Sequence, residues 1–407
     1  MTVTAADVIA YPDSPGTTAA AGFRAAGVTA GLKASGNRDL ALVVNDGPLQ
    51  VGVAVFTTNR VVGAPVVWSR QAVSDGVVHA VVLNSGGANV CTGPEGFQDV
   101  HATAEKVADV LGASAADVLV ASTGLIGERL PLGKLLAGVD AAGAALAPGA
   151  PAGEAAADAI RTTDTVAKTA HVVVETPAGS FTVGGMAKGA GMLAPALATM
   201  LCVVTTDAAV DAQVADAALR AGTRASFDRV DSDGCMSTSD TVALLVSGAS
   251  GVTPDDAAFA AAVQAVCASL ARQLVADAEG ATHDIAVTVT GAETEDAALA
   301  VARAVTRSNL FKTAVFGNDP NWGRILAQVG TVPVEVAAFD PDELDVSVNG
   351  VQVCRAGGAY RPRDEVDMAA QREVRVDVDL HAGDASVTVW TNDLTHDYVH
   401  ENSAYST

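Results

Sequence analysis

One long apolar stretch carries two residues that could do chemistry. Residues 183–208 read VGGMAKGAGMLAPALATMLCVVTTDA, and the centre of this stretch is almost entirely small or apolar. Lys188 precedes the centre and Thr199 lies within it. A hydroxyl buried in an apolar run costs free energy unless it finds a partner. Thr199 is therefore either an ordinary strand threonine or a hydroxyl that the fold holds for a reaction.

A threonine hydroxyl needs a base before it can act as a nucleophile. A threonine at the start of a chain can use its own α-amine, whose pKa is about 7.7 to 8. Thr199 gains such an amine only if the Ala198–Thr199 bond is cut, and the small Ala198 leaves room for attack on its carbonyl. The alternative is a β-branched residue that simply suits a buried strand. These residues alone leave both interpretations open.

The glycines of the same stretch fit a dinucleotide-binding fingerprint only weakly. Residues 189–194 match G-x-G-x-x-A and follow a predicted strand. Pro195, however, stands where the helix of that motif must be established. We therefore expect no dinucleotide, and we expect no other cofactor.

Two turns in the first half of the chain combine hydroxyls with exposed backbone amides. Residues 122–128, STGLIGE, end an apolar strand, and such a turn suits either an oxyanion hole or an ordinary loop. Residues 162–165, TTDT, are typical of a helix cap or turn.

Three polar segments stand out in the second half. Glu279 follows a predicted helix, where a solvated glutamate is the usual finding. Residues 319–324, DPNWGR, predict a rigid loop that is either a structural turn or a ligand site. The tail, residues 401–407, is polar and should fray unless it docks on the protein.

The elements that must position these residues indicate an α+β fold. Strand patterns alternate with turns over residues 38–93, and a pattern of helix pieces with a surface loop covers residues 133–160. The remaining expectations are helices at 98–111, 255–277 and 294–308, strands at 117–124, 285–289, 374–380 and 385–391, and a hairpin turning at 349–350. The last two strands alternate almost perfectly, which is typical of antiparallel sheets.

Composition excludes several classes of partner. The 407 residues are 49% hydrophobic, enough for two to three domains, and carry a net charge of −23. So acidic a surface repels phosphate backbones and anionic lipid, so we expect neither nucleic acid nor a membrane as partner. No signal peptide is recognisable, and the five cysteines form no C-x-x-C pair, which favours reduced thiols in the cytoplasm. His396 and His400 are too few ligands to predict a metal site.

Together these segments resemble the ornithine acetyltransferase family, the bifunctional glutamate N-acetyltransferases of arginine biosynthesis. The resemblance runs nearly end to end and rests on nine motifs in the right order. They are GVTAGLKASGNRDLAL (27–42), AVFTTNRVVGAPV (54–66), VVLNSGGANVCTG (81–93), ASTGLIGERLP (121–131), RTTDT (161–165), GGMAKGAGM with LATML (184–201), AEGAT (278–282), FKTAVFGNDPNWGRI (311–325) and ENSAYST (401–407).

The resemblance implies a fold and a division of the chain. The fold is an αββα sandwich of the DmpA type with smaller α+β parts added. The precursor cuts itself between Ala198 and Thr199. Residues 1–198 become an α chain that forms the N-terminal part of the sandwich, and residues 199–407 become a β chain that starts with the nucleophile and ends in a tail returning to the active site. Two cleaved copies form an α2β2 heterotetramer.

The resemblance also implies an activity and its residues. Thr199 takes the acetyl group from N2-acetylornithine as an ester and passes it to glutamate by a ping-pong route. Thr123 and Gly124 form the oxyanion hole. The substrate contacts carried over are Thr162, Lys188, Thr199, Glu279, Asn402 and Thr407.

Two other functions stay open on the sequence. An aminopeptidase of the same fold would use water as acyl acceptor, and a ligand-binding protein would keep the chain uncut. The sequence also leaves open whether acetyl-CoA serves as a second donor, because no CoA-binding motif is visible.

Overall fold

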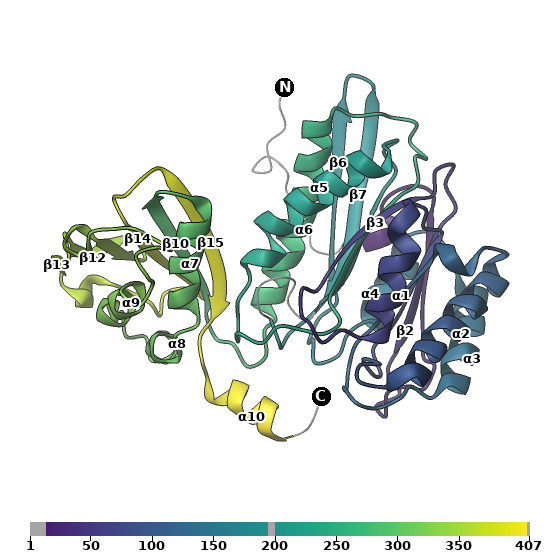
Figure 1. The fold of residues 1–407 in the computed structure, drawn as a ribbon, viewed down its shortest axis with the longest axis horizontal. Coiled ribbons are helices and arrows are strands. Elements are labelled where there is room, and N and C mark those ends of the chain that lie inside the picture. The colour runs from purple at the N-terminus through teal and green to yellow at the C-terminus, as the bar shows by residue number, and fades with distance from the viewer. Residues whose placement is uncertain (1–13, 194–199, 405–407) are drawn as a thin grey trace.

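The computed structural model describes residues 14–193 and 200–404, which form a larger and a smaller lobe (Figure 1). The larger lobe contains two β-sheets that face each other, and the smaller lobe contains a third. The two lobes meet at a narrow region, called the waist below. An ion pair between Arg307 and Asp231 and an isolated β-bridge between Val230 and Trp390 connect them there. The last helix, α10 (His396–Ala404), runs below the gap between them (Figure 1).

The larger lobe is an αββα sandwich, so the predicted fold is confirmed. Its first sheet has the order β1 (Phe23–Val28), β2 (Leu40–Asn45), β4 (Ala80–Asn84), β5 (Val118–Ser122). The second has the order β3 (Val51–Phe56), β9 (Thr241–Val246), β8 (Leu201–Thr206), β7 (Gly179–Lys188), β6 (Lys168–Thr176). Inward side chains of both sheets share one core.

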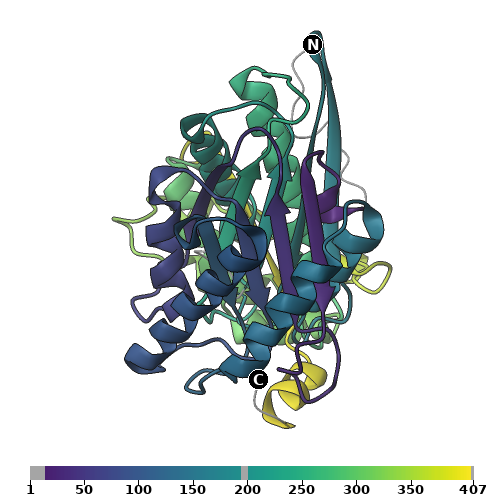
Figure 2. The same ribbon diagram turned by 90° about the vertical axis from the view of Figure 1, so that its right-hand side faces the viewer.

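Helices cover the outer faces of both sheets. Helices α2 (Gly93–Leu111) and α3 (Leu132–Ala145) pack on the four-stranded sheet and stand in front of it in Figure 2. Helices α5 (Ala212–Ala225) and α6 (Asp256–Ala276) pack on the five-stranded sheet. Helix α1 (Ala64–Ala72) packs beside β5, and α4 (Ala150–Ala159) packs on β1.

Strand β8 explains why the sequence around it is so apolar. It is the central strand of its sheet, and all six of its residues are buried. Leu201 and Val203 point into the core between the sheets, whereas Cys202 and Val204 point to the α5–α6 layer. Because successive side chains of a strand face opposite ways, a strand covered on both faces needs a continuous apolar run.

The smaller lobe is built from the C-terminal third of the chain. Its mixed sheet has the order β13 (Gly358–Ala359), β12 (Val351–Arg355), β11 (Asp345–Val348), β14 (Glu373–Asp379), β10 (Asp284–Ala292), β15 (Ala385–Asn392). Helices α7 (Glu295–Thr306), α8 (Asn309–Phe316) and α9 (Trp322–Val329) pack with this sheet around a second core.

Most predicted elements are confirmed, with two differences, at helix α1 and in the pairing of strand β14. Residues 64–72 form helix α1 within a region predicted as strands and turns; Pro65 in its first turn suits a helix start, and Val66, Ser69 and Ala72 share its buried face. The helix pieces and surface loop predicted over residues 133–160 are confirmed as α3, α4 and the loop between them. Strand β14 pairs in parallel with β10, so the antiparallel expectation holds only for its pairing with β11.

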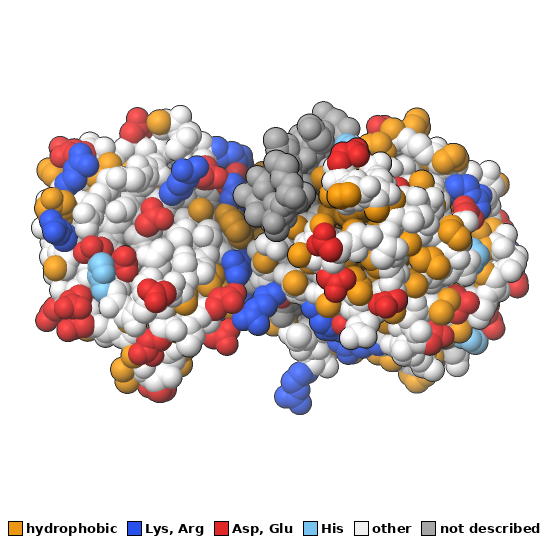
Figure 3. Space-filling model, turned by 90° about the horizontal axis from the view of Figure 1, so that it is seen from above, with side chains coloured by type: hydrophobic (Ala, Val, Ile, Leu, Met, Phe, Trp, Pro, Cys, Tyr) orange, Lys and Arg blue, Asp and Glu red, His pale blue; other side chains and the backbone are white. Residues whose placement is uncertain are grey.

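The surface of the molecule is acidic, and its longest apolar helix belongs to the core. Helix α6 is long and apolar enough to cross a membrane by length and composition, but its apolar face packs on the five-stranded sheet as a core helix. All five cysteines carry free thiols. Acidic side chains are spread over both lobes, and several Lys and Arg side chains lie along the waist (Figure 3).

Candidate active site

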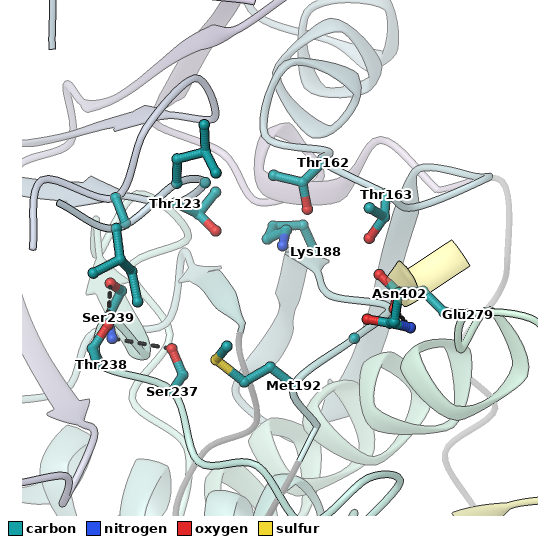
Figure 4. A pocket seen from close by; sticks show the side chains of 15 residues that line it. Thr123, Thr162, Thr163, Lys188, Met192, Ser237, Thr238, Ser239, Glu279 and Asn402 are labelled. Carbon is teal, nitrogen blue, oxygen red and sulfur yellow. Dashed lines mark hydrogen bonds between the residues drawn. The ribbon is translucent and has the colours of Figure 1, made fainter. Parts of the chain in front are cut away.

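A cavity of about 270 Å³ gathers polar side chains from segments far apart in the sequence. Their hydroxyl, ammonium and carboxylate groups surround one space in Figure 4. The lining residues are Ala88, Thr123–Ile126, Thr162, Thr163, Lys188, Gly191, Met192, Ser237–Ser239, Glu279 and Asn402.

The turn after β5 presents a hydroxyl and an amide to this cavity. The Thr123 amide donates to the Asn84 carbonyl, and the Gly87 amide donates to the Thr123 carbonyl, each at 3.0 Å. Gly124 has a φ of 127°, and a Cβ there would lie 2.8 Å from the Gly87 nitrogen, so a glycine is required. Neither the Thr123 hydroxyl nor the Gly124 amide bonds to any residue within 14–193 or 200–404. Two free donors side by side suit a developing negative charge.

A buried chain of charges holds Lys188 at the cavity wall. Asp164 accepts from the Lys168 ammonium at 2.6 Å and from the Gly189 amide at 2.7 Å, and it lies 4.0 Å from the Lys188 ammonium. Lys168 also pairs with Asp277 at 2.5 Å. All of these side chains are at most 7% exposed. The Thr162 amide donates to Asp164 as well, which fixes the turn that carries Thr162.

Asp164 and Lys188, neighbours in this chain of charges, have pKa values that are both lowered, for different reasons. Burial by itself would raise the pKa of Asp164, but the Lys188 and Lys168 ammonium groups hold it well below its usual range. Burial lowers the pKa of Lys188, and Asp164 opposes that shift. A lysine whose charge is only partly compensated is suited to attract a substrate carboxylate.

The lowered pKa of Asp164 predicts how stability depends on pH. A carboxylate with a depressed folded-state pKa contributes stability above its unfolded pKa, about 3.9, and loses it as the pH falls through the folded value. We expect Asp164→Asn to lower the melting temperature most at neutral pH and progressively less below about pH 4. Melting of both proteins from neutral pH to about pH 3 checks this; a difference that stays constant would contradict it.

Glu279 and Asn402 close the cavity on the side of α10. The Asn402 amide donates to the Glu279 carboxylate at 2.9 Å, and the Glu279 amide donates to the Ala190 carbonyl at 2.9 Å. A Cβ on Gly191 would lie 2.5 Å from a Glu279 oxygen, so glycine lets the carboxylate approach the backbone. The C-terminal helix is therefore docked at the cavity, as far as residue 404.

The structure brings together six of the residues predicted for the site: Thr123, Gly124, Thr162, Lys188, Glu279 and Asn402. Ala198, Thr199 and Thr407 lie outside the described residues. The described chain resumes at Met200, whose amide donates to Asp240 at 3.0 Å.

Sequence reasoning missed one wall of the cavity. Ser237, Thr238 and Ser239 line it from the segment before β9. The signal was the dense run of polar residues DSDGCMSTSD at 231–240. The DPNWGR loop, in contrast, leads into α9, where the Arg324 guanidinium donates to the Leu310 carbonyl at 2.6 Å; it is not part of this cavity. A dinucleotide fingerprint requires a helix to begin within its glycine-rich turn. Residues 189–193 form no helix.

Comparison with known proteins decides the family. The sequence matches the ArgJ family over residues 24–407. The chain belongs to the ArgJ family. The arginine biosynthesis bifunctional protein ArgJ of Streptomyces coelicolor is 61% identical over 389 residues, covering 96% of this chain and 99% of that protein. Its counterpart in Thermobifida fusca is 60% identical over 390 residues, with 96% and 99% covered. A solved ornithine acetyltransferase complexed with ornithine, from Mycobacterium tuberculosis, is 52% identical with a TM-score of 0.44, covering 48% of this chain and 100% of that one.

Membership of the ArgJ family confirms the resemblance drawn from the nine motifs. The chain is an acyltransferase of arginine biosynthesis. The polar cavity between the STG turn, Lys188 and α10 is its candidate active site.

Proposed function

We propose that this ArgJ protein transfers the acetyl group of N2-acetylornithine to glutamate through an ester on Thr199. The observation that carries the proposal is the convergence of six residues from five sequence motifs on one cavity. Two of the lining residues, Gly191 and Met192, stand shortly before Thr199 in the sequence.

Each residue takes a separate role in the proposed reaction. Thr199, freed by cleavage of the Ala198–Thr199 bond, attacks the acetyl carbonyl with its α-amine as base. The Thr123 hydroxyl and the Gly124 amide, both without a described partner, stabilise the oxyanion. Ornithine then leaves, and the glutamate amine attacks the acetyl ester in the second half-reaction.

The charged residues of the cavity bind the charged groups of the substrates. Lys188 attracts a substrate carboxylate, and Glu279 attracts an ammonium group, because a cavity lined by opposite charges suits an amino acid. Thr162 and Asn402 supply hydrogen bonds, and we propose that Thr199 and the terminal Thr407 complete the substrate contacts.

The proposed cleavage divides the sandwich without separating it. Residues 1–198 would supply β7 and residues 199–407 would supply β8. These two strands are paired by hydrogen bonds, with Val183 opposite Thr206 at one end and Lys188 opposite Leu201 at the other. The two chains would therefore stay together as one folded unit. We further propose that two such units form an α2β2 heterotetramer in the cytoplasm.

A coupled assay tests the activity and its donor. With N2-acetylornithine alone, ornithine release should stop after one turnover, and glutamate should restore it with N-acetylglutamate as co-product. An aminopeptidase would release ornithine equally without glutamate. Replacing N2-acetylornithine by acetyl-CoA in the same assay determines whether the enzyme has the second donor.

Loss of one oxyanion donor should slow the chemical step. We expect Thr123→Ala to lower kcat by about 10²- to 10³-fold, since a single oxyanion-hole donor is worth that much in other acyl transferases. Thr288→Ala, a threonine of the smaller lobe that pairs with Thr388, is the control and should keep its kcat. A Thr123→Ala enzyme with normal kcat would remove Thr123 from the oxyanion hole.

A further inference from the structure

A second cavity, of about 350 Å³, lies at the waist beside the candidate active site. Its walls come from the segment before β9, from α7 and α8 of the smaller lobe and from α10 (Figure 1). Among the described residues, Glu279 alone lines both cavities. Small-molecule sites commonly have volumes of about 300 to 1,000 Å³, so the second cavity is large enough for a ligand.

A buried lysine lines this second cavity without a counter-ion. Lys312 is 6% exposed, and its ammonium donates to the Ser232 carbonyl. It forms no ion pair with any carboxylate of the described residues. Burial lowers the pKa of Lys312, although three nearby aspartates act to raise it. Because an ammonium has three donors, two of them remain for a ligand.

A carboxylate on the same cavity has no cation as partner. Each oxygen of Asp233 accepts one backbone amide, from Cys235 at 3.1 Å and from Met192 at 2.6 Å. No Lys, Arg or His side chain of the described residues forms an ion pair with Asp233. Both oxygens can still accept a hydrogen bond, because each has two lone pairs. Lys312 and Asp233 thus offer opposite charges to the same space.

Glu279 adds a second carboxylate without a cation. It accepts the Asn402 amide, and it forms no ion pair with a described Lys, Arg or His side chain. The other charged side chains of the cavity have partners: Arg307 pairs with Asp231, and Asp393 is hydrogen-bonded to His283. The charges left for a ligand are therefore one ammonium and two carboxylates.

We propose that this second cavity binds a basic amino acid. The ligand carboxylate binds the Lys312 ammonium, and its α-ammonium binds Asp233, because charge-assisted hydrogen bonds of this kind are the strong ones. The cation at the end of the ligand side chain binds Glu279. Burial and the carboxylates of Asp233 and Glu279 raise the pKa of Tyr398 to about 12, so its hydroxyl stays protonated and donates to the ligand.

Glu279 links the second cavity to the transfer reaction. A ligand cation on Glu279 competes with the substrate ammonium proposed to bind the same carboxylate, so each ligand weakens the binding of the other by the same factor. We expect L-lysine to raise the KM for N2-acetylornithine in the natural protein but not in Lys312→Met. This consequence rests on the proposed transfer activity, whereas binding in the second cavity does not.

Equilibrium dialysis with labelled L-lysine tests the site. L-lysine carries the three required charges, and L-norleucine, which is lysine without its side-chain ammonium, is the matched ligand control. Lys312→Met should bind L-lysine at least about 10-fold more weakly than the natural protein, as expected for loss of a charge-assisted hydrogen bond. Lys188→Met, which changes only the candidate active site, should keep the natural affinity. L-norleucine should bind the natural protein at least about 10-fold more weakly than L-lysine does.

Lys134→Met is the control variant, because Lys134 also donates to a backbone carbonyl, that of Gly31 at 2.9 Å, but lines neither cavity. It should bind L-lysine like the natural protein. If the natural protein does not bind L-lysine, or if Lys188→Met loses binding while Lys312→Met keeps it, the second site is refuted. If circular dichroism shows that Lys312→Met does not fold, Asp233→Asn replaces it: weaker binding supports the site, and unchanged binding refutes it.

Discussion

Replacing Thr199 by alanine should leave the precursor as a single uncut chain with no transferase activity. The proposed cleavage needs the Thr199 hydroxyl to attack the Ala198 carbonyl, and the proposed transfer needs it again to carry the acetyl group. Loss of a catalytic nucleophile typically costs several orders of magnitude in kcat, so we expect at least about a 10³-fold loss. A denaturing gel and the N2-acetylornithine–glutamate assay measure the two effects.

Thr205→Val is the matched control for this substitution. Thr205 lies in the buried strand β8, and its hydroxyl donates to the Thr17 carbonyl at 2.9 Å. Its loss should cost some stability but leave both cleavage and transfer in place. If Thr199→Ala were cut like the natural chain, the nucleophile would have to be another residue.

Replacing Lys168 by methionine should strongly destabilise the fold. Lys168 is fully buried and pairs with Asp164 and Asp277. Removing the shared cation leaves two buried carboxylates with less compensation, and breaking a buried ion pair in this way costs about 3 to 5 kcal/mol. Asp164 would then be drawn toward Lys188, so the KM for substrate should rise as well. Urea denaturation and the transfer assay measure these effects.

Lys106→Met is the comparison for that prediction. Lys106 pairs with Asp140 at 2.6 Å at the surface, where Lys106 is half-buried and Asp140 is exposed. An exposed ion pair of this kind contributes about 0 to 1 kcal/mol. If Lys168→Met and Lys106→Met lowered the free energy of unfolding equally, the buried chain of charges would not stabilise the cavity wall.

Much of the architecture could be predicted from local patterns. The alternating residues of β14 and β15, the apolar stripe of α6 and the Asn349-Gly350 turn each follow from rules that act within a few residues. Helix α1 was missed because its buried face spans only about two turns. The parallel pairing of β10 with β14 was missed because pairing direction depends on the connection between strands and not on alternation.

The candidate site was predictable only in part. The motif resemblance pointed to Thr123, Gly124, Thr162, Lys188, Glu279 and Asn402, which the fold brings to one cavity. The residues that hold them were not evident. Lys168 stands at the start of an ordinary strand pattern, and Asp240 ends a polar run, so their burial and partners depend on long-range packing.

Direct detection of the acyl-enzyme tests the central claim. The purified protein is mixed with N2-acetylornithine without glutamate, quenched, and analysed by mass spectrometry of its fragments. We predict one added acetyl group on the fragment that begins at Thr199, and its loss with formation of N-acetylglutamate once glutamate is added. An unmodified Thr199 fragment during steady transfer, or an acetyl group that stays in place when glutamate is added, would contradict the account.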